Sequence, residues 1–598
     1  MNKIALPILL LLALLSGCGG GSDSTEASSS DDSVVEDTHD SDEDNAEHDD
    51  ETSSSTTPLP TGATSQVKVL AFNDLGMHCM DKNFSVFSIL PPFNVVNAQV
   101  VSHKSDGSPQ LLTDVDLRYS AVMDRQDSIN SSSLNNKTDF WQYAPALFGT
   151  DLQPGEGLTG LYMPADNPHN PGPQPLSYNT QHGWFSAEGI PITPIDDTGR
   201  TNAYPMLRIS AYDKQTGDLL GETDIVVPVS QETECNLCHG SGEMAANDPT
   251  IAWATDGDLN VQSSLNILIL HDIRHDTQLQ QQTPVLCASC HYSPPLDLAG
   301  KGPQGKQQEL PTFSQVMHEY HGELQTPQGT PVFPANAPTE ETCYQCHPGK
   351  TTQCQRGAMK SANIACENCH GGMLAVGGEY PLQVNGSLDG QNDGGTRRPW
   401  IDLPRCQSCH TGDAVNHLTG DDLVLDQDNI RLRQTYRTGD ESASPLLANN
   451  RRFAENQNTL FRNSKGHGGI ACEGCHGSPH AIWPNPDTQA NDNLTATQLQ
   501  GHIGSIIECH TCHTPGSLPM TINGPHGLHN INDARWIDHA HEDFYERNPN
   551  GCKACHGNNL EGTPLSKAVV NRTLQVEGRT VTLKQGQQIS CDLCHHKP

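Results

Sequence analysis

The pattern Cys-x-x-Cys-His recurs nine times between residues 235 and 595 of this 598-residue chain and uses eighteen of its 21 cysteines. The copies, called units 1 to 9 in chain order, begin at Cys235, Cys287, Cys343, Cys366, Cys406, Cys472, Cys509, Cys552 and Cys591. This repeat constrains the fold more than any other feature, because each copy needs the same local backbone and the same chemistry.

The spacing within each unit is that of c-type haem attachment. Two cysteines separated by two residues reach the two vinyl groups of one haem, and the adjacent histidine binds the iron. Zinc would instead group its ligands in fours and needs no histidine after every pair, and a thioredoxin-like dithiol occurs once. The sequence therefore predicts nine c-type haems. The second cysteines are Cys238, Cys290, Cys346, Cys369, Cys409, Cys475, Cys512, Cys555 and Cys594, and the iron-binding histidines are His239, His291, His347, His370, His410, His476, His513, His556 and His595.

Hydrophobic side chains are scarce for a chain of this length. They make up 34% of the residues, whereas roughly 45–50% is usual when glycine is included. Nine covalently held macrocycles would supply the missing apolar surface. We therefore expect residues 233–598 to form a mostly irregular multihaem domain with short helices.

Fourteen further histidines between residues 235 and 598 are candidates for the sixth position on each iron. His271 and His275 lie four apart in a segment with the pattern of a short helix, and His318 and His321 lie three apart, so each pair shares one helix face. The expected distal ligands are His271, His275, His318, His321, His417, His467, His502, His526 and His539. The other five are His480, His510, His529, His541 and His596. The sequence does not assign any of them to a particular iron.

Residues 66–232 contain no such unit and have the pattern of short β-strands. Alternating, β-rich runs occur at 67–72, 94–102 and 111–123, and two more flank a turn at Gly217. Pro and Gly clusters interrupt the middle of the segment. The pattern predicts an N-terminal all-β, sandwich-like domain, with a small barrel as the alternative.

The N-terminus has the features of an export signal. Lys3 precedes a short apolar run, and "LSGC" follows, ending at Cys18. We expect residues 1–17 to be the signal peptide. Residues 19–57 hold fourteen acidic residues and no Lys or Arg, a composition that cannot bury enough apolar surface to fold. Residues 18–65 are therefore predicted to be an extended, acidic tether.

Two cysteines besides Cys18 lie outside the units. They are Cys79 and Cys354, and in an oxidising compartment they are candidates for a disulfide. Two unpaired thiols are the first alternative, and the second is that Cys354 replaces Cys366 in an unusually spaced attachment. His78 beside Cys79 is a candidate distal ligand, with a loop histidine as the alternative.

"LSGC" resembles the lipobox of bacterial lipoproteins, which implies a lipid anchor on Cys18. Gly19 rather than Asp after it favours the outer membrane. With the β domain and the nine units, the whole plan resembles the outer-surface multihaem c-type cytochromes of metal-reducing bacteria. That resemblance implies electron transfer from periplasmic or outer-membrane donor cytochromes to an extracellular or periplasmic acceptor. Family members commonly alternate two β domains with two haem clusters, whereas this chain has one of each. The filament-forming multihaem cytochromes also have continuous arrays of units, so self-association of this chain stays open.

Two function classes remain. An electron carrier is favoured, because an iron with two histidine ligands has no vacant site for a substrate. The alternative is an oxidoreductase of nitrite, hydroxylamine or a sulfur oxyanion with one open iron. The formal net charge of −37 argues against a nucleic-acid partner, whose phosphates would be repelled, and favours a partner with a basic face.

Overall fold

The computed structural model describes residues 67–165, 172–334, 337–377, 405–410, 451–456 and 459–595. The predicted signal peptide, the tether and Cys18 lie outside these ranges, as do His417 and His596. Within them, no helix is both long and apolar enough to cross a bilayer.

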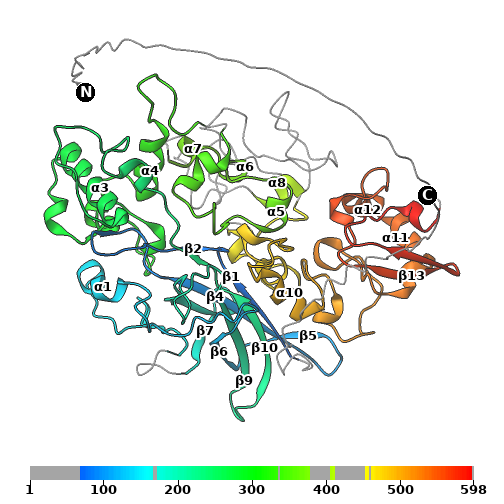
Figure 1. The fold of residues 1–598 in the computed structure, drawn as a ribbon. Coiled ribbons are helices and arrows are strands. Elements are labelled where there is room, and N and C mark those ends of the chain that lie inside the picture. The colour runs from blue at the N-terminus through cyan, green and yellow to red at the C-terminus, as the bar shows by residue number, and fades with distance from the viewer. Residues whose placement is uncertain are drawn as a thin grey trace, which may run out of the picture. The chain divides into compact units, whose positions relative to one another are not determined.

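The first part of the chain forms one antiparallel sheet, whose strands lie side by side in Figure 1. The sheet order is β1-β4-β8-β7-β6-β9-β10, and β5 pairs with β4. The strands are β1 (Lys68–Asn73), β4 (Asn94–His103), β5 (Pro109–Leu112), β6 (Val115–Val122), β7 (Gln174–Asn179), β8 (Trp184–Ile190), β9 (Met206–Asp213) and β10 (Leu219–Val226). The predicted antiparallel β domain is confirmed.

The sheet is nearly closed, because its first strand β1 also lies against its last strand β10. This is closer to a barrel than to a sandwich of two separate sheets. Its interior is apolar and includes Val96, Leu117 and Ile209. Helix α1 (Phe140–Phe148) contributes Phe140 to this core, with its ring edge-on to that of Phe84.

Strands β1 and β4 are buried on both faces, so they lack the polar alternation of a strand with one wet face. Val69 and Ala71 point into the sheet's core. Leu70 and Phe72, on the opposite face, pack against residues from the second part of the chain. The outer face of these two strands is therefore the surface on which the unit-bearing region rests.

The second part of the chain consists of short helices and turns joined by irregular segments, as predicted. The predicted helices around His271 and His318 are confirmed as α3 and α4. The helices are α2 (Asn236–His239), α3 (Leu259–His275), α4 (Phe313–Gly322), α5 (Gly357–Ser361), α6 (Cys366–His370), α7 (Met373–Gly377), α8 (Cys406–His410), α9 (Cys472–His476), α10 (Asp492–Gln500), α11 (Glu542–Arg547) and α12 (Pro549–His556).

Small strand pairs complete the structure. Two are parallel and join distant segments: β2 (His78–Cys79) with β11 (Val229–Ser230), and β3 (Phe87–Ser88) with β12 (Val285–Leu286). The hairpin β13 (Arg572–Val576) and β14 (Arg579–Leu583) lies near the C-terminus. The β2 pair joins the segment after β1 to the end of the β domain, and the β3 pair joins it to the residues directly before unit 2.

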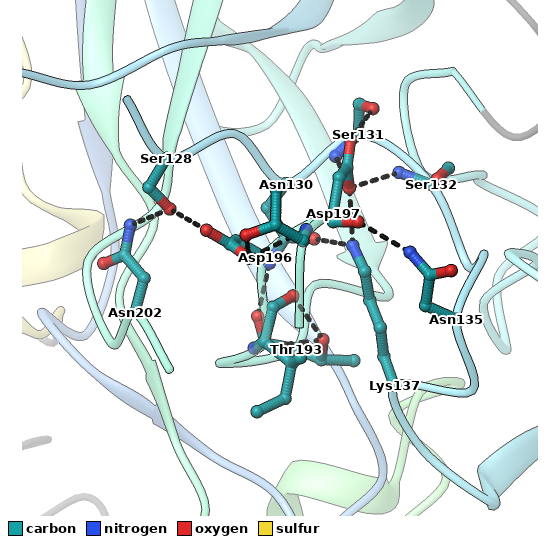
Figure 2. Close-up of polar contacts among 12 residues, drawn as sticks. Ser128, Asn130, Ser131, Ser132, Asn135, Lys137, Thr193, Asp196, Asp197 and Asn202 are labelled. Atoms are coloured by element: carbon teal, nitrogen blue, oxygen red, sulfur yellow. Dashed lines mark hydrogen bonds and ion pairs between the residues drawn. The ribbon is translucent and has the colours of Figure 1, made fainter. Parts of the chain in front are cut away.

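A buried ion pair fastens two loops of the β domain to one another (Figure 2). The Lys137 ammonium is fully buried and donates to Asp197 at 2.7 Å and to Asn130 at 2.9 Å. Burial alone would raise the pKa of Asp197, but hydrogen bonds from Lys137 and Ser131 outweigh it and hold that pKa below its usual value. The β domain is thus held together by polar contacts as well as by its apolar core.

Candidate metal centres

Each of the nine units forms one helical turn. Units 4, 5, 6 and 8 lie within helices α6, α8, α9 and α12, and unit 1 begins one residue before α2. The other four units each begin a 3-10 turn, as at Cys287–Ser289. In unit 1, the backbone N–H of His239 donates to the carbonyl of Cys235 at 2.8 Å. A single turn brings residues i, i+3 and i+4 to one side of the helix. Both cysteines and the histidine of a unit can therefore face one group.

Six unit histidines lie opposite a second histidine from elsewhere in the chain. The distances between ring centres range from 5.6 to 6.4 Å. The pairs are His239–His321, His347–His318, His370–His480, His476–His526, His513–His467 and His595–His541.

That separation is the one required of two ligands of a single iron. A metal lies about 2 Å from an imidazole nitrogen, and that nitrogen lies about 1 Å from its own ring centre. Two imidazoles on opposite sides of one iron therefore have ring centres roughly 6 Å apart. Direct ring stacking would bring them closer, as in His529 on Trp536 at 4.2 Å. The residues present fit a haem iron with two histidine ligands.

Two more units have a histidine within electrostatic reach. His291 of unit 2 contributes to the lowered pKa of His271, and His556 of unit 8 contributes to the lowered pKa of His529, although burial is the larger cause in both. In unit 5, Phe453 lies beside His410, with ring centres 6.0 Å apart. The predicted candidate His417 lies outside the described residues.

Hydrogen bonds at Nδ1 orient many of these rings. His318 donates from Nδ1 to the Ser314 carbonyl at 2.8 Å, and His321 does so to Met317 at 2.6 Å. A carbonyl oxygen only accepts, so Nδ1 carries the proton and Nε2 keeps a free lone pair. The same bond to a carbonyl holds the unit histidine His291 and the facing histidines His526 and His541. Such a bond fixes the tautomer and direction of a metal-binding histidine.

Burial lowers the pKa of several unit histidines and so favours the neutral imidazole, which is the form that binds a metal. Desolvation lowers the pKa of His347 to about 4, and the neighbouring His318 adds to the shift. Desolvation also lowers the pKa of His476 to about 4, with His526 as the next cause. These pairs therefore face each other at neutral pH without the repulsion of two charged rings.

Five units surround one continuous cavity of 2360 Å³. Side chains of units 4 to 8 line it, together with His467 and His526. The unit residues in its wall are Cys369, Cys406, Cys409, His410, Cys472, Cys475, His476, Cys509, Cys512, His513 and Cys555. Cysteines of five units thus line one shared space and are not joined in disulfides.

Some histidines predicted to be distal ligands are engaged in other contacts. Both ring nitrogens of His502 already hold hydrogen bonds, to the Ile503 carbonyl at 2.8 Å and to Glu508 at 2.9 Å. His275 lies beside His271, with 4.8 Å between ring centres, rather than opposite a unit histidine. His78 bonds Asp74 through Nε2 at 3.1 Å. The side chain of His539 lies outside the described part of the structure.

Two histidines that face units, His480 and His541, were not in the predicted ligand set. His529, which lies within electrostatic reach of His556, was also absent from it. His529 could have been found from the sequence, because it follows His526 by three residues, the same spacing as the pair on α4. His103 at the end of β4 was also missed: its Nε2 is buried without a hydrogen-bond partner, and it lies within electrostatic reach of His513.

The two cysteines outside the units are separate thiols in the structure. Cys354 packs against a small cluster that includes Met77 and Tyr204. Burial is the main cause that raises the pKa of the Cys79 thiol, and the nearby Cys354 is the second cause. Cys366, for which Cys354 was a possible substitute, begins a regular unit turn in α6.

No protein-family model, curated protein or solved structure matches this chain.

Proposed function

We propose that the chain binds nine c-type haems and carries electrons along them toward an extracellular or periplasmic acceptor. The observation that carries this proposal is the set of histidine pairs at about 6 Å, each joining a unit to a second imidazole. Nothing in the packing of a small apolar core requires buried histidines to meet in this way. A haem supplies a one-electron couple whose potential depends on its axial ligands and surroundings.

The chain's own residues would prepare each site in three ways. The unit cysteines would hold the macrocycle covalently, and the unit histidine would bind the iron. The opposite histidine, which a hydrogen bond at Nδ1 orients in four of the six pairs, would be the second ligand and would keep water and substrates from the iron. Two filled axial positions are what an electron carrier needs and what an enzyme acting at the iron must avoid.

Pairs of facing histidines link different units to one another. On α4, His318 faces unit 3 and His321 faces unit 1, so two residues of one helix serve both units. His526 faces unit 6, and His529 lies close to His556 of unit 8. Neighbouring redox centres held by shared short segments would stay close together, which supports transfer from unit to unit.

The alternative function is an oxidoreductase with one open iron. Within the described ranges, Phe453 lies beside His410 of unit 5, with 6.0 Å between ring centres. The predicted candidate His417 follows unit 5 in the sequence. In a His417→Ala variant, the appearance of one high-spin iron would support a closed site that this histidine completes.

The proposed place of action rests on sequence features. We propose an outer-membrane lipoprotein, anchored through Cys18 and exposed at the cell surface, with a periplasm-facing arrangement as the second possibility. A net charge of −37 would attract a donor cytochrome with a basic face, and such steering weakens as salt rises.

The cofactor content gives the first test. When the chain is produced in a host that matures c-type cytochromes, its mass should exceed that of the processed polypeptide by nine haems. A pyridine haemochrome assay should give the same ratio. Replacing both cysteines of one unit, for example Cys591→Ala with Cys594→Ala, should lower the number to eight. A wild-type protein without covalent haem, or with bound zinc instead, would refute the proposal.

A further inference from the structure

One loop of the chain, residues 466–481, provides residues to three units. His467 faces His513 of unit 7, α9 is unit 6 itself, and His480 faces His370 of unit 4. Small shifts of this loop would therefore change three sites together.

The loop has few apolar side chains of its own, so its position depends on what it rests on. Its support is the outer face of β1 and β4. Ala471 packs with Phe72 and Trp184 in one buried cluster. Gly474 lies over β1, where a Cβ added to it would be 3.8 Å from Leu70.

A single glutamine of β4 makes the central polar contact with this loop. Gln99 is 2% exposed. Its Oε1 accepts from the backbone N–H of Ala471 at 2.8 Å, and its Nε2 donates to the Gly469 carbonyl at 3.0 Å. These two backbone groups lie between His467 and Cys472. One side chain thus sets the spacing between a residue facing unit 7 and the start of unit 6.

The far end of the loop rests on the end of β1. Ser478 donates from its hydroxyl to the Asn73 carbonyl. Gly76, at a φ of +89°, approaches so closely that an added Cβ would lie 3.2 Å from Cβ of Ser478 and 3.4 Å from Cβ of His480. The backbone carbonyl of His480 also accepts from Arg356 N–H at 2.8 Å. Residues 478–480, which connect unit 6 to the histidine that faces unit 4, are therefore held at the end of the same surface.

We infer that the outer face of β1 and β4 is a positioning surface for units 4, 6 and 7, and that Gln99 is its central positioning residue. This inference rests on the proposed haem binding. Gln99 touches no unit histidine and acts through the backbone of the loop. Its amide offers both a donor and an acceptor, which neither glutamate nor methionine can do.

The test compares Gln99→Met with Gln174→Met in the full-length, haem-loaded protein. Methionine nearly conserves the volume of glutamine and removes both hydrogen-bonding groups. Gln174 is a matched control, since it is 4% exposed, lies on β7 and donates to the Gly172 carbonyl within the β domain. Both variants should keep nine haems. Electron paramagnetic resonance should then show altered low-spin signals for two or three of the nine irons in Gln99→Met only.

A second variant sharpens the result. Gln99→Glu keeps an acceptor for the Ala471 N–H but sets a carboxylate oxygen against the Gly469 and Gly183 carbonyls, to which Nε2 of Gln99 donates, so the same low-spin signals should be altered in this variant too. If Gln99→Met gives the wild-type spectrum, or if Gln174→Met changes the spectrum equally, the positioning role is wrong while haem binding stands. A wild type without low-spin haem signals would refute the proposed function instead.

Discussion

Replacing Arg356 by methionine is expected to lower the free energy of unfolding by about 3–5 kcal/mol, the cost of leaving one partner of a buried ion pair alone. The Arg356 guanidinium is 2% exposed and binds Asp492 through two hydrogen bonds of 2.6 and 2.9 Å. It also donates to the Gly76 carbonyl at 2.7 Å and lies 5.1 Å from the centre of the Tyr204 ring. One side chain therefore joins the β domain to the segments around units 4 and 6.

Urea unfolding followed by far-ultraviolet circular dichroism measures this effect. Arg118→Met is the matched control, because its pair with Asp116 is of similar length, 2.7 Å, but its side chains are 48% and 35% exposed. Pairs near the surface contribute little. A double variant, Arg356→Met with Asp492→Leu, should recover part of the loss because it removes the stranded carboxylate. A loss below about 1 kcal/mol for Arg356→Met alone, the size of an ordinary hydrogen bond, would contradict this account of the interface.

Replacing His480 by alanine is expected to convert one of the nine irons from low-spin to high-spin. His480 faces His370 with 6.1 Å between ring centres, and burial lowers the pKa of His480, which favours its neutral, metal-binding form. Removing the ring would open the sixth position of unit 4 and leave the other eight unchanged. Resonance Raman and electron paramagnetic resonance spectra would each report one high-spin iron per chain.

His502→Ala is the control for this experiment. Both nitrogens of His502 are used in hydrogen bonds to Ile503 and Glu508, so its loss should reduce stability without creating high-spin iron. His480→Met should restore a low-spin iron, at a higher potential than that of the wild type. The opposite pattern, with high-spin iron in His502→Ala and none in His480→Ala, would show that the histidine pairs of the structure are not the ligand pairs.

Local features were predictable from the sequence because they depend on residues close together in the chain. The unit turns, the strands around Val96 and Ile209, and the helices carrying His271 and His318 all follow from spacing or alternation within short windows. The sheet's closure did not follow, because the contact of β1 with β10 depends on how every strand between them curves. Strands β7 and β8 and helix α1 were also missed, since Pro and Gly clusters hide the pattern of that region.

The pairing of histidines was the least predictable feature. His370 and His480 are distant in sequence, and only the docking of the 466–481 loop on β1 and β4 brings them together. His502 and His480 look alike in the sequence, each a single histidine near a unit. The difference is Glu508, a 4% exposed carboxylate that captures His502. A ligand role therefore depends on which polar groups the fold leaves beside each ring.

The most direct test of the central claim is the electron paramagnetic resonance spectrum of the fully oxidised, nine-haem protein. The account predicts that all irons are low-spin, since two histidine ligands would fill both axial positions of each. A high-spin signal equal to one or more irons per chain would contradict it and would favour the oxidoreductase with an open site.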